Sequence, residues 1–251
     1  MNTNTVSPDI AVSQSPAALP LHNKISELLA REIAAGHWRV GERLPPESVL
    51  ATTLNVAVGT LRKALAVLEQ DGAIERKQGS GTYVKQAPKG KGVYDLFRLE
   101  LAQGGGLPTA VNLEFVRLPH PDFVPAFVPT FGLEQRASCY RLRRLRLLNN
   151  TPIALEEIYF DTRHNSSLTI NDLGEALYLF YQTKLHFWIA SATDRLGMSA
   201  VPAWSPSLFK LAAGAPCGYI ERESWSGTDT IEEFSRTWFD ATACQYVSRL
   251  K

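Results

Sequence analysis

The sequence predicts an α+β protein in which a helical N-terminal third is followed by a larger part built mainly of strands. Apolar residues recur at helical spacing up to about residue 72, and stretches rich in β-branched and aromatic residues dominate from residue 109 onward. With 251 residues and 45% hydrophobic side chains, the chain is long and apolar enough for two packed domains. We expect a disordered tail at 1–20, a first domain at 21–85, a linker at 86–92 and a second domain at 93–251.

Three helices are predicted in the first domain. The first ends near Gly36, the second begins after Pro45 and Pro46, and the third ends near Gly72. The buried stripes of the first and third helices are expected to be Leu21, Ile25, Leu28, Leu29 and Ile33, and Leu61, Ala64, Leu65 and Leu68. Because about three or four residues separate the second helix from the third, the pair forms a helix-turn-helix.

A β-hairpin is predicted immediately after the third helix. Segments 73–77 and 82–85 have strand character, and Gln78-Gly79-Ser80-Gly81 between them is a turn sequence in which two residues are free to take positive φ. A hairpin in this place is the wing of a winged helix-turn-helix. The linker that follows, QAPKGKG, lacks an apolar anchor.

A helix-turn-helix binds DNA because its second helix fits the major groove and presents its N-terminal residues to base edges. Here that end comprises Val58, Gly59, Thr60, Leu61, Arg62 and Lys63. Leu61 belongs to the core, so the candidates for contacts to bases or phosphates are Thr60, Arg62 and Lys63. The wing residues expected to reach the DNA backbone or the minor groove are Arg76, Lys77, Gln78, Gly79, Ser80, Gly81 and Thr82.

The charge distribution permits a DNA partner without requiring one. The formal net charge is +1, but residues 21–91 contain 11 Lys and Arg against 7 Asp and Glu, whereas residues 92–251 contain 15 against 17. The alternative is that the fold is a protein-interaction module in which Arg62 and Lys63 lie on a solvated face.

The second domain is predicted to be an antiparallel sheet with helices. Asn149-Asn150-Thr151-Pro152 and Gly227-Thr228-Asp229 have the composition of hairpin turns. Asp172 and Ser205 are expected to cap two helices, the first carrying Leu173, Leu177 and Phe180 and the second ending at Gly214. The expected strands are 109–118, 138–148, 153–160, 186–194, 218–226, 230–240 and 245–250.

Several linked motifs between Leu21 and Lys85 match one family in order. They are Gly41-Glu42-Arg43-Leu44-Pro45, Glu47, Thr60-Leu61-Arg62-Lys63-Ala64-Leu65, Leu68-Glu69 and Gly79-Ser80-Gly81-Thr82-Tyr83-Val84. In these motifs the segment resembles the winged helix of the GntR family of bacterial transcription regulators. The resemblance implies that the partner is double-stranded operator DNA, and it adds Arg43, Glu47 and Ser48 to the candidate DNA-binding residues.

The segment also departs from the family pattern at two places. The family commonly has Arg where Ser48 stands and a Ser-Arg pair where Ala57 and Val58 stand. Two expected contacts to phosphates or bases are therefore missing, and the operator sequence of better-matched members does not transfer to this chain.

The second domain resembles an effector-binding domain through looser motifs. These are Arg144-Leu145-Arg146, Pro152-Ile153-Ala154-Leu155-Glu156, Leu177-Tyr178, Arg222 and the strand that contains Glu233. They make residues 93–251 similar to the UTRA domain of the HutC subfamily. The resemblance implies a chorismate-lyase-like antiparallel sheet with helices, a small-molecule effector, and a homodimer held mainly by the UTRA domains. Relatives respond to phosphorylated sugars, to amino-acid catabolites such as urocanate, or to phosphonate-related compounds.

Strand alternation gives these charged residues a common location. Arg144 and Arg146 share a face with Tyr140 and Leu142, and a charge on an otherwise apolar face needs a partner. Arginines suit a carboxylate or phosphate, and glutamates suit hydroxyl, amine or amide groups. The resemblance to the family implies that the effector-binding residues are Arg144, Arg146, Glu156, Arg222 and Glu233, with Tyr178 and the backbone around Thr109 nearby. Two interpretations stay open: these residues line a ligand pocket, or they form an Arg-Glu network that satisfies itself inside the sheet.

The sequence supports neither an enzyme nor a cofactor. It contains no Gly-Xaa-Ser-Xaa-Gly elbow, and Gly104-Gly105-Gly106 precedes Leu107-Pro108 as in a turn rather than a nucleotide-binding loop. The histidines and cysteines lack zinc-ligand spacing, so no metal is expected. An enzyme of chorismate-lyase-like fold remains an alternative on fold kinship alone.

The cellular setting is inferred from three features of the sequence. No apolar run reaches the roughly 18 to 20 residues that a membrane helix needs, and no secretory signal precedes the first domain. Cys139, Cys217 and Cys244 are odd in number and widely spaced, which suits reduced thiols. We expect a cytoplasmic protein with no membrane partner.

Overall fold

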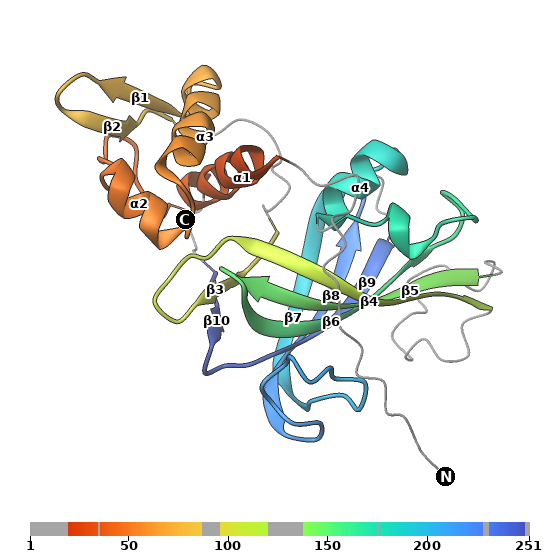
Figure 1. Cartoon of the computed structure of the whole chain (residues 1–251). Coiled ribbons are helices and arrows are strands. Elements are labelled where there is room, and N and C mark those ends of the chain that lie inside the picture. The colour runs from red at the N-terminus through yellow and green to blue at the C-terminus, as the bar shows by residue number, and fades with distance from the viewer. Residues whose placement is uncertain are drawn as a thin grey trace, which may run out of the picture.

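The N-terminal part of the chain forms three helices and a hairpin (Figure 1). The computed structural model describes residues 20–34, 36–86, 96–119, 138–174, 176–227 and 231–248, so the predicted tail except Pro20, and linker residues 87–92, lie outside the described residues. The elements are α1 (Leu21–Ala34), α2 (Glu47–Thr53), α3 (Val58–Gln70), β1 (Ile74–Lys77) and β2 (Gly81–Val84). The predicted winged helix-turn-helix is confirmed.

Apolar faces of all three helices meet in one core. Ile25, Leu28, Leu61 and Leu65 are at most 1% exposed, as their helical spacing predicts. The prediction that Leu21 is buried is wrong: it is the first residue of α1, at the end of the helix, and is 45% exposed. Asn55, between α2 and α3, has φ of +53°, a left-handed conformation that asparagine tolerates and that turns the chain sharply.

The hairpin is tied to the segment before α2. The amide of Leu44 donates to the carbonyl oxygen of Thr82 at 2.9 Å, and the amide of Val84 donates to that of Glu42 at 2.9 Å. Arg43 lies against Gly81, where an added Cβ would stand 2.6 Å from the arginine Nε. These contacts fix the wing relative to the helix-turn-helix.

The C-terminal part is built on a six-stranded antiparallel sheet in the order β4-β5-β6-β9-β8-β7 (Figure 1). Its strands are β4 (Pro108–Pro119), β5 (Ser138–Leu148), β6 (Thr151–Asp161), β7 (Ser191–Ala200), β8 (Pro216–Trp225) and β9 (Ile231–Phe239). Asn149 and Asn150 take φ of +48° and +63° in the β5–β6 hairpin, which confirms that predicted turn. A separate pair, β3 (Leu99–Leu101) and β10 (Cys244–Tyr246), lies beside the sheet.

The two faces of this sheet have different coverings. We call the pocket face the one that carries Tyr140, Leu142, Arg144 and Arg146, and the outer face the opposite one. Helix α4 (Leu177–Lys184) packs on one end of the pocket face through Leu177, Phe180 and Tyr181. On the outer face, Trp204 and Phe209 from the segment 201–215 cover Trp238 and its neighbours.

Two sequence predictions in this part are wrong, and one strand was not predicted. No helix lies between Ser205 and Gly214. The segment forms single turns instead, in one of which the amide of Phe209 donates to the carbonyl oxygen of Pro206 at 3.0 Å, because Phe209 and Trp204 pack against the sheet. The predicted strand at 186–194 is displaced to β7, since His186 has φ of +59° and interrupts extended backbone. Strand β3 was not expected.

Helix α4 also begins later than the sequence suggests. Asp172 does not cap it; the Asp172 carboxylate accepts from the amide and hydroxyl of Thr169, both at 2.7 Å, around the short 3₁₀ helix η3 (Ile170–Asp172). Leu173, expected within the helix, precedes α4 and is buried against it.

Hydrogen bonds from Asn149 and Arg31, and the packing of Leu107, join the domains. Asn149 donates through Nδ2 to the carbonyl of Thr53, at the end of α2, over 3.0 Å, and its Oδ1 accepts from the amide of Leu107 over 2.9 Å. At α1, Arg31 Nη1 donates to the carbonyl of Phe97 over 3.1 Å. Leu107 itself belongs to the core of the N-terminal domain.

The glycine turn at 104–106 yields a stability prediction. Gly106 has φ of +111°, and a Cβ there would lie 2.9 Å from Leu148 Cβ, whereas Gly105 has φ of +65° with nothing within 4 Å. We expect Gly106→Ala to lower the free energy of unfolding by about 2–4 kcal/mol and Gly105→Ala by about 1 kcal/mol. Urea unfolding of both variants checks this; equal losses would show that the close approach to Leu148 is unimportant.

Candidate functional site

The N-terminal end of α3 presents the predicted DNA-contacting residues on one exposed surface. Leu61 is fully buried, as expected, while Gly59, Arg62 and Lys63 are exposed and Thr60 and Val58 are half-buried. The N-cap residue of this helix is Ala57, whose side chain makes no capping hydrogen bond. The helix therefore starts with free backbone amides, a favourable place for an anion such as phosphate.

Arg62 is held by its neighbours. Its Nε donates to Glu47 Oε2 over 2.6 Å, and its carbonyl oxygen accepts from Arg76 Nη2 over 3.0 Å. The structure thus brings together α2, α3 and the wing through three residues that the sequence singled out. The Arg62 side chain remains 65% exposed, so its guanidinium is accessible.

The wing supplies further basic groups. Lys77 Nζ lies 2.8 Å from Glu75 Oε1 and 4.9 Å from the centroid of the Tyr83 ring, which holds it beside the hairpin. Gln78, Gly79 and Ser80 are exposed at the tip, and Gly81 and Thr82 are half-buried below it. Arg43 and Ser48 are also exposed, next to the wing and on α2 respectively.

A hollow on the pocket face, between the sheet, α4 and β3, contains about 720 Å³ of space including its opening to solvent. The lining residues are Phe97, Arg98, Leu99, Arg144, Arg146, Glu156, Ile158, Ala176, Leu177, Tyr178, Ile220, Arg222, Glu233, Ser235 and Thr237.

Glu156 lies between two arginines of the adjacent strand. Arg144, directly opposite in the β5–β6 register, donates to Glu156 Oε2 through Nε at 2.9 Å and through Nη2 at 2.7 Å. Arg146 is farther away, with 3.6 Å between its Nε and Glu156 Oε1, and its guanidinium lies 4.7 Å from the centroid of the Phe97 ring. Burial tends to raise the pKa of Glu156, but the two arginines hold it below its usual value.

A second ion pair closes the other side of the pocket. Arg222 donates to Asp194 through Nε at 2.6 Å and Nη2 at 2.7 Å, and Tyr246 donates to the same carboxylate at 2.7 Å. Burial opposes the charged form of Asp194, yet the hydrogen bonds from Arg222 and Tyr246 lower its pKa.

Glu233 differs from the other acidic groups. Its carboxylate accepts from Tyr181 at 2.7 Å and from Tyr178 and Ser224 at 3.3 Å each. Burial raises the pKa of Glu233, and the hydrogen bond from Tyr181 and the charges of Arg144 and Arg222 only partly offset this effect. Burial and the Glu233 charge in turn raise the pKa of Tyr178, whose hydroxyl stays protonated.

The pocket therefore carries an excess of positive charge. Four guanidinium groups, those of Arg98, Arg144, Arg146 and Arg222, line it. Against them stand Glu156, Glu233 and, behind Arg222, Asp194. Burial, and then the nearby charge of Arg222, lower the pKa of Arg98, as expected where like charges are close together.

Six of the seven residues predicted to bind an effector line this hollow. Thr109 is the exception: it pairs with Leu147, whose side chain packs on the outer face. Arg144 and Arg222 line the hollow and are also paired with carboxylates, so the structure shows the Arg-Glu pairing, and effector binding by these residues stays a prediction.

Several lining residues were missed. Ser235 and Thr237 alternate with Glu233 on β9, so strand periodicity alone could have found them. Phe97 and Arg98 precede the short strand β3 and carry no recognisable motif.

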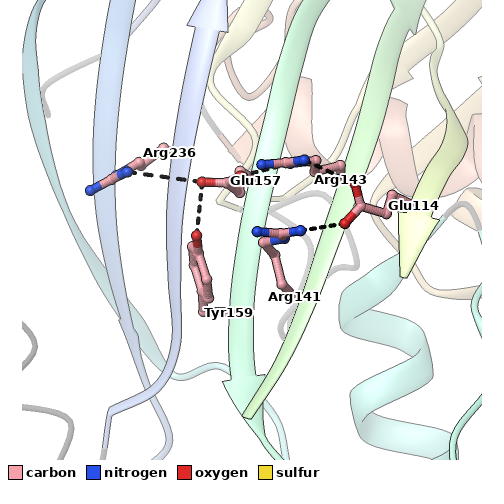
Figure 2. Close-up of polar contacts among 6 residues, drawn as sticks. All are labelled: Glu114, Arg141, Arg143, Glu157, Tyr159 and Arg236. Carbon is pink, nitrogen blue, oxygen red and sulfur yellow. Dashed lines mark hydrogen bonds and ion pairs between the residues drawn. The ribbon is translucent and has the colours of Figure 1, made fainter. Parts of the chain in front are cut away.

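The other arginines of β5 serve the outer face (Figure 2). Arg143 donates to Glu157 at 2.7 Å and to Glu114 at 2.9 Å, and Arg141 also pairs with Glu114. Tyr159 donates to Glu157 at 2.9 Å. The arginine-rich run of β5 thus divides into two sets with separate partners on opposite faces.

The three cysteines lie in the interior of the second domain, each at most 4% exposed. Burial raises the pKa of the Cys139 thiol to about 11 and that of Cys244 to about 12. Within the described part of the chain, no group of three or more potential ligands is placed to hold a metal ion. Across the same residues, the helices are too short or too polar to span a bilayer.

Comparisons with known proteins identify both parts of the chain. Residues 21–84 match the model for bacterial regulatory proteins of the gntR family, and residues 103–245, more than half of the chain, match the UTRA domain. The HTH-type transcriptional regulator SmoD of Agrobacterium fabrum is 44% identical over 93% of this chain and 97% of its own length. The HTH-type transcriptional repressor NagR of Bacillus subtilis is 23% identical over 94% and 98%.

The fold agrees with solved structures. The crystal structure of YydK from Bacillus subtilis superposes with a TM-score of 0.53 at 20% identity, covering 93% of this chain and all of that one. The similarity places the chain among regulators rather than enzymes. With a gntR-type winged helix at its N-terminus and a UTRA domain after it, the chain belongs to the GntR family of bacterial transcription regulators, in the group that carries UTRA effector domains.

Proposed function

We propose that this regulator is a repressor that binds a palindromic operator as a homodimer and is released by a small, polar, anionic metabolite held in the pocket. The observation that carries the proposal is the set of four arginines lining a hollow that also holds Glu156, Glu233 and Tyr178. Guanidinium groups bind carboxylate, phosphate or similar anions, while the glutamates and Tyr178 suit hydroxyl groups. The effector is then a hydroxylated acid or a phosphorylated sugar.

The DNA-binding part of the proposal rests on the exposed surface formed by α3 and the wing. Arg62 and Lys63 are exposed on α3, and Arg76, Lys77 and the wing tip are exposed on the hairpin. In this proposal the first two enter the major groove and the others contact the phosphates beside it. One α3 helix reads few base pairs, so two copies related by a two-fold axis would double the sequence read. Such a complex would act in the cytoplasm, where the chromosome lies.

Release from DNA requires the effector to distinguish two conformations. An effector with equal affinity for both would leave operator occupancy unchanged. In this proposal, the pocket binds the metabolite more tightly when the two wings no longer match the operator. The name of NagR as a repressor supports the sign of the response.

The DNA-binding surface gives the first test of this function. We expect Arg62→Ala to weaken binding to promoter fragments surrounding its own gene by roughly 1–3 kcal/mol, because a guanidinium contact to a base edge is lost. Lys63→Ala should cost less and lower the salt dependence of binding, as loss of a phosphate contact does. Lys210→Ala, an exposed lysine of the second domain, is the charge-matched control. Gel-shift affinity of Arg62→Ala equal to that of the unmodified protein would contradict the assignment.

The pocket gives the second test. We would screen phosphorylated sugars, sugar acids and urocanate by thermal shift, and measure each hit by calorimetry. Arg98→Met should weaken binding of an anionic hit at least about tenfold, because a charge-assisted hydrogen bond contributes roughly 1.5–3 kcal/mol. Arg143→Met, on the outer face of the same sheet, should leave that affinity unchanged.

The same screen tests two further points. Recovery of the hit chemically unchanged after incubation would exclude an enzyme that acts on it. Binding of a neutral analogue with the same affinity would contradict an anionic effector.

A further inference from the structure

Phe97 stands where the pocket meets the DNA-binding domain. Its ring lines the pocket, and the Arg146 guanidinium lies 4.7 Å from the ring centroid. The Arg31 guanidinium, from α1, lies 5.6 Å from the same centroid. One aromatic ring is therefore in contact distance of two cations that belong to different domains.

The backbone carbonyl of Phe97 is also contacted from both domains. Its carbonyl oxygen accepts from Arg31 Nη1 at 3.1 Å and from Arg98 Nη1 at 3.3 Å. Arg98 lines the pocket, whereas Arg31 is 5% exposed and pairs with the neighbouring Glu32 of α1. Three arginines thus meet at one residue, two from the pocket side and one from the DNA-binding domain.

We propose that Phe97 is the residue through which the pocket communicates with α1, which rests on the function proposed above. An anion that pairs with Arg146 or Arg98 competes with Phe97 for those guanidinium groups, because a guanidinium bound to a charged oxygen is a weaker partner for a π face or a carbonyl. Phe97 is then free to shift, and the hydrogen bond from Arg31 shifts with it. The orientation of α1, and so of α3 and the wing packed on it, changes relative to the sheet.

This arrangement supplies the differential affinity that regulation needs. In the conformation described here, Arg146 is shared between Glu156 and the Phe97 ring. An anionic effector binds more tightly to a conformation in which Arg146 and Arg98 turn toward the pocket. Its binding therefore favours the displaced position of Phe97. Residues 31 and 97 do not need to touch the effector to set the response.

The test uses substitutions in place of an identified effector. Arg146→Met removes the positive charge beside the Phe97 ring, which imitates the effect of an anion that pairs with Arg146. Arg31→Met removes the contact between α1 and Phe97. The two substitutions are combined with each other, and each is combined with Phe97→Leu. Arg146→Lys keeps a cation at the ring. Arg143→Met is the matched control, because Arg143 also lies over an aromatic ring, 4.9 Å from Trp204, but on the outer face.

Two measurements are made on the full chain. Spin labels at the exposed positions Gln70 and Gln182 report the distance between α3 and α4, with labelled chain diluted in unlabelled chain so that distances within one molecule dominate. Affinity for the promoter fragment retained by the unmodified protein reports the functional consequence.

We expect Arg146→Met and Arg31→Met each to shift the label distances and to change DNA affinity roughly three- to tenfold, the range of a partly buried cation–π contact. The double variant should show no more than the larger single effect, and Phe97→Leu should remove the effect of Arg146→Met. Arg146→Lys, which retains a cation at the ring, should change both measurements less than Arg146→Met. Arg143→Met should change neither measurement.

Strictly additive effects of Arg31→Met and Arg146→Met, or unchanged label distances in Arg146→Met, would overturn the proposal. So would a shift of the same size in Arg143→Met. If the unmodified protein retained no promoter fragment, the proposed function would fail, but the label distances would still decide whether Arg146 and Arg31 are coupled through Phe97.

Discussion

The ion pair between Arg144 and Glu156 is the constraint on which the second domain depends. Both residues are buried in adjacent strands, and a buried charge that loses its partner costs roughly 3–5 kcal/mol. A one-residue slip of β5 against β6 would move Arg144 to the outer face and bring Arg143 into the pocket. The pair of Arg144 with Glu156 therefore favours one register of the sheet and, with it, the set of side chains that faces the pocket, whereas Glu157 on the outer face also has Tyr159 and Arg236 as partners.

The same pairing makes the pocket suited to a charged ligand. Arginines locked by carboxylates keep a fixed orientation without a ligand, so little conformational entropy is lost when an anion binds beside them. Arg146 and Arg98 are the adaptable members, because their contacts include the Phe97 ring and carbonyl. In the proposed mechanism, the pairs of Arg144 and Arg222 with carboxylates hold the pocket in shape, and Arg146 and Arg98 change partners when the effector binds. Arg31 and Asn149 are the residues whose hydrogen bonds between the domains would then rearrange.

Much of this structure follows from local patterns in the sequence. Helical spacing identified the buried residues of α1 and α3 except for Leu21, and alternation placed Arg144 and Arg146 on one face of β5. That Glu156 lies on the same face of the sheet follows from the β5–β6 register, which the sequence alone did not provide. Long-range packing determined the rest. The segment 201–215 has helix-compatible residues but follows the shape of the outer face, and β3 forms because Leu99 and Leu101 find β10, more than 140 residues away. Phe97 could not be identified in advance, because its importance comes from arginines that converge on it from three places in the chain.

The buried thiols bear on what this regulator can sense. Oxidation by peroxide proceeds through the thiolate, and the raised pKa values of Cys139, Cys217 and Cys244 keep them neutral near pH 7 and away from solvent. Their sulfur atoms act as small apolar groups that fill the interior of the domain. While the domain is folded, these three thiols are therefore poor targets for peroxide, and a redox response through them would require the domain to open first.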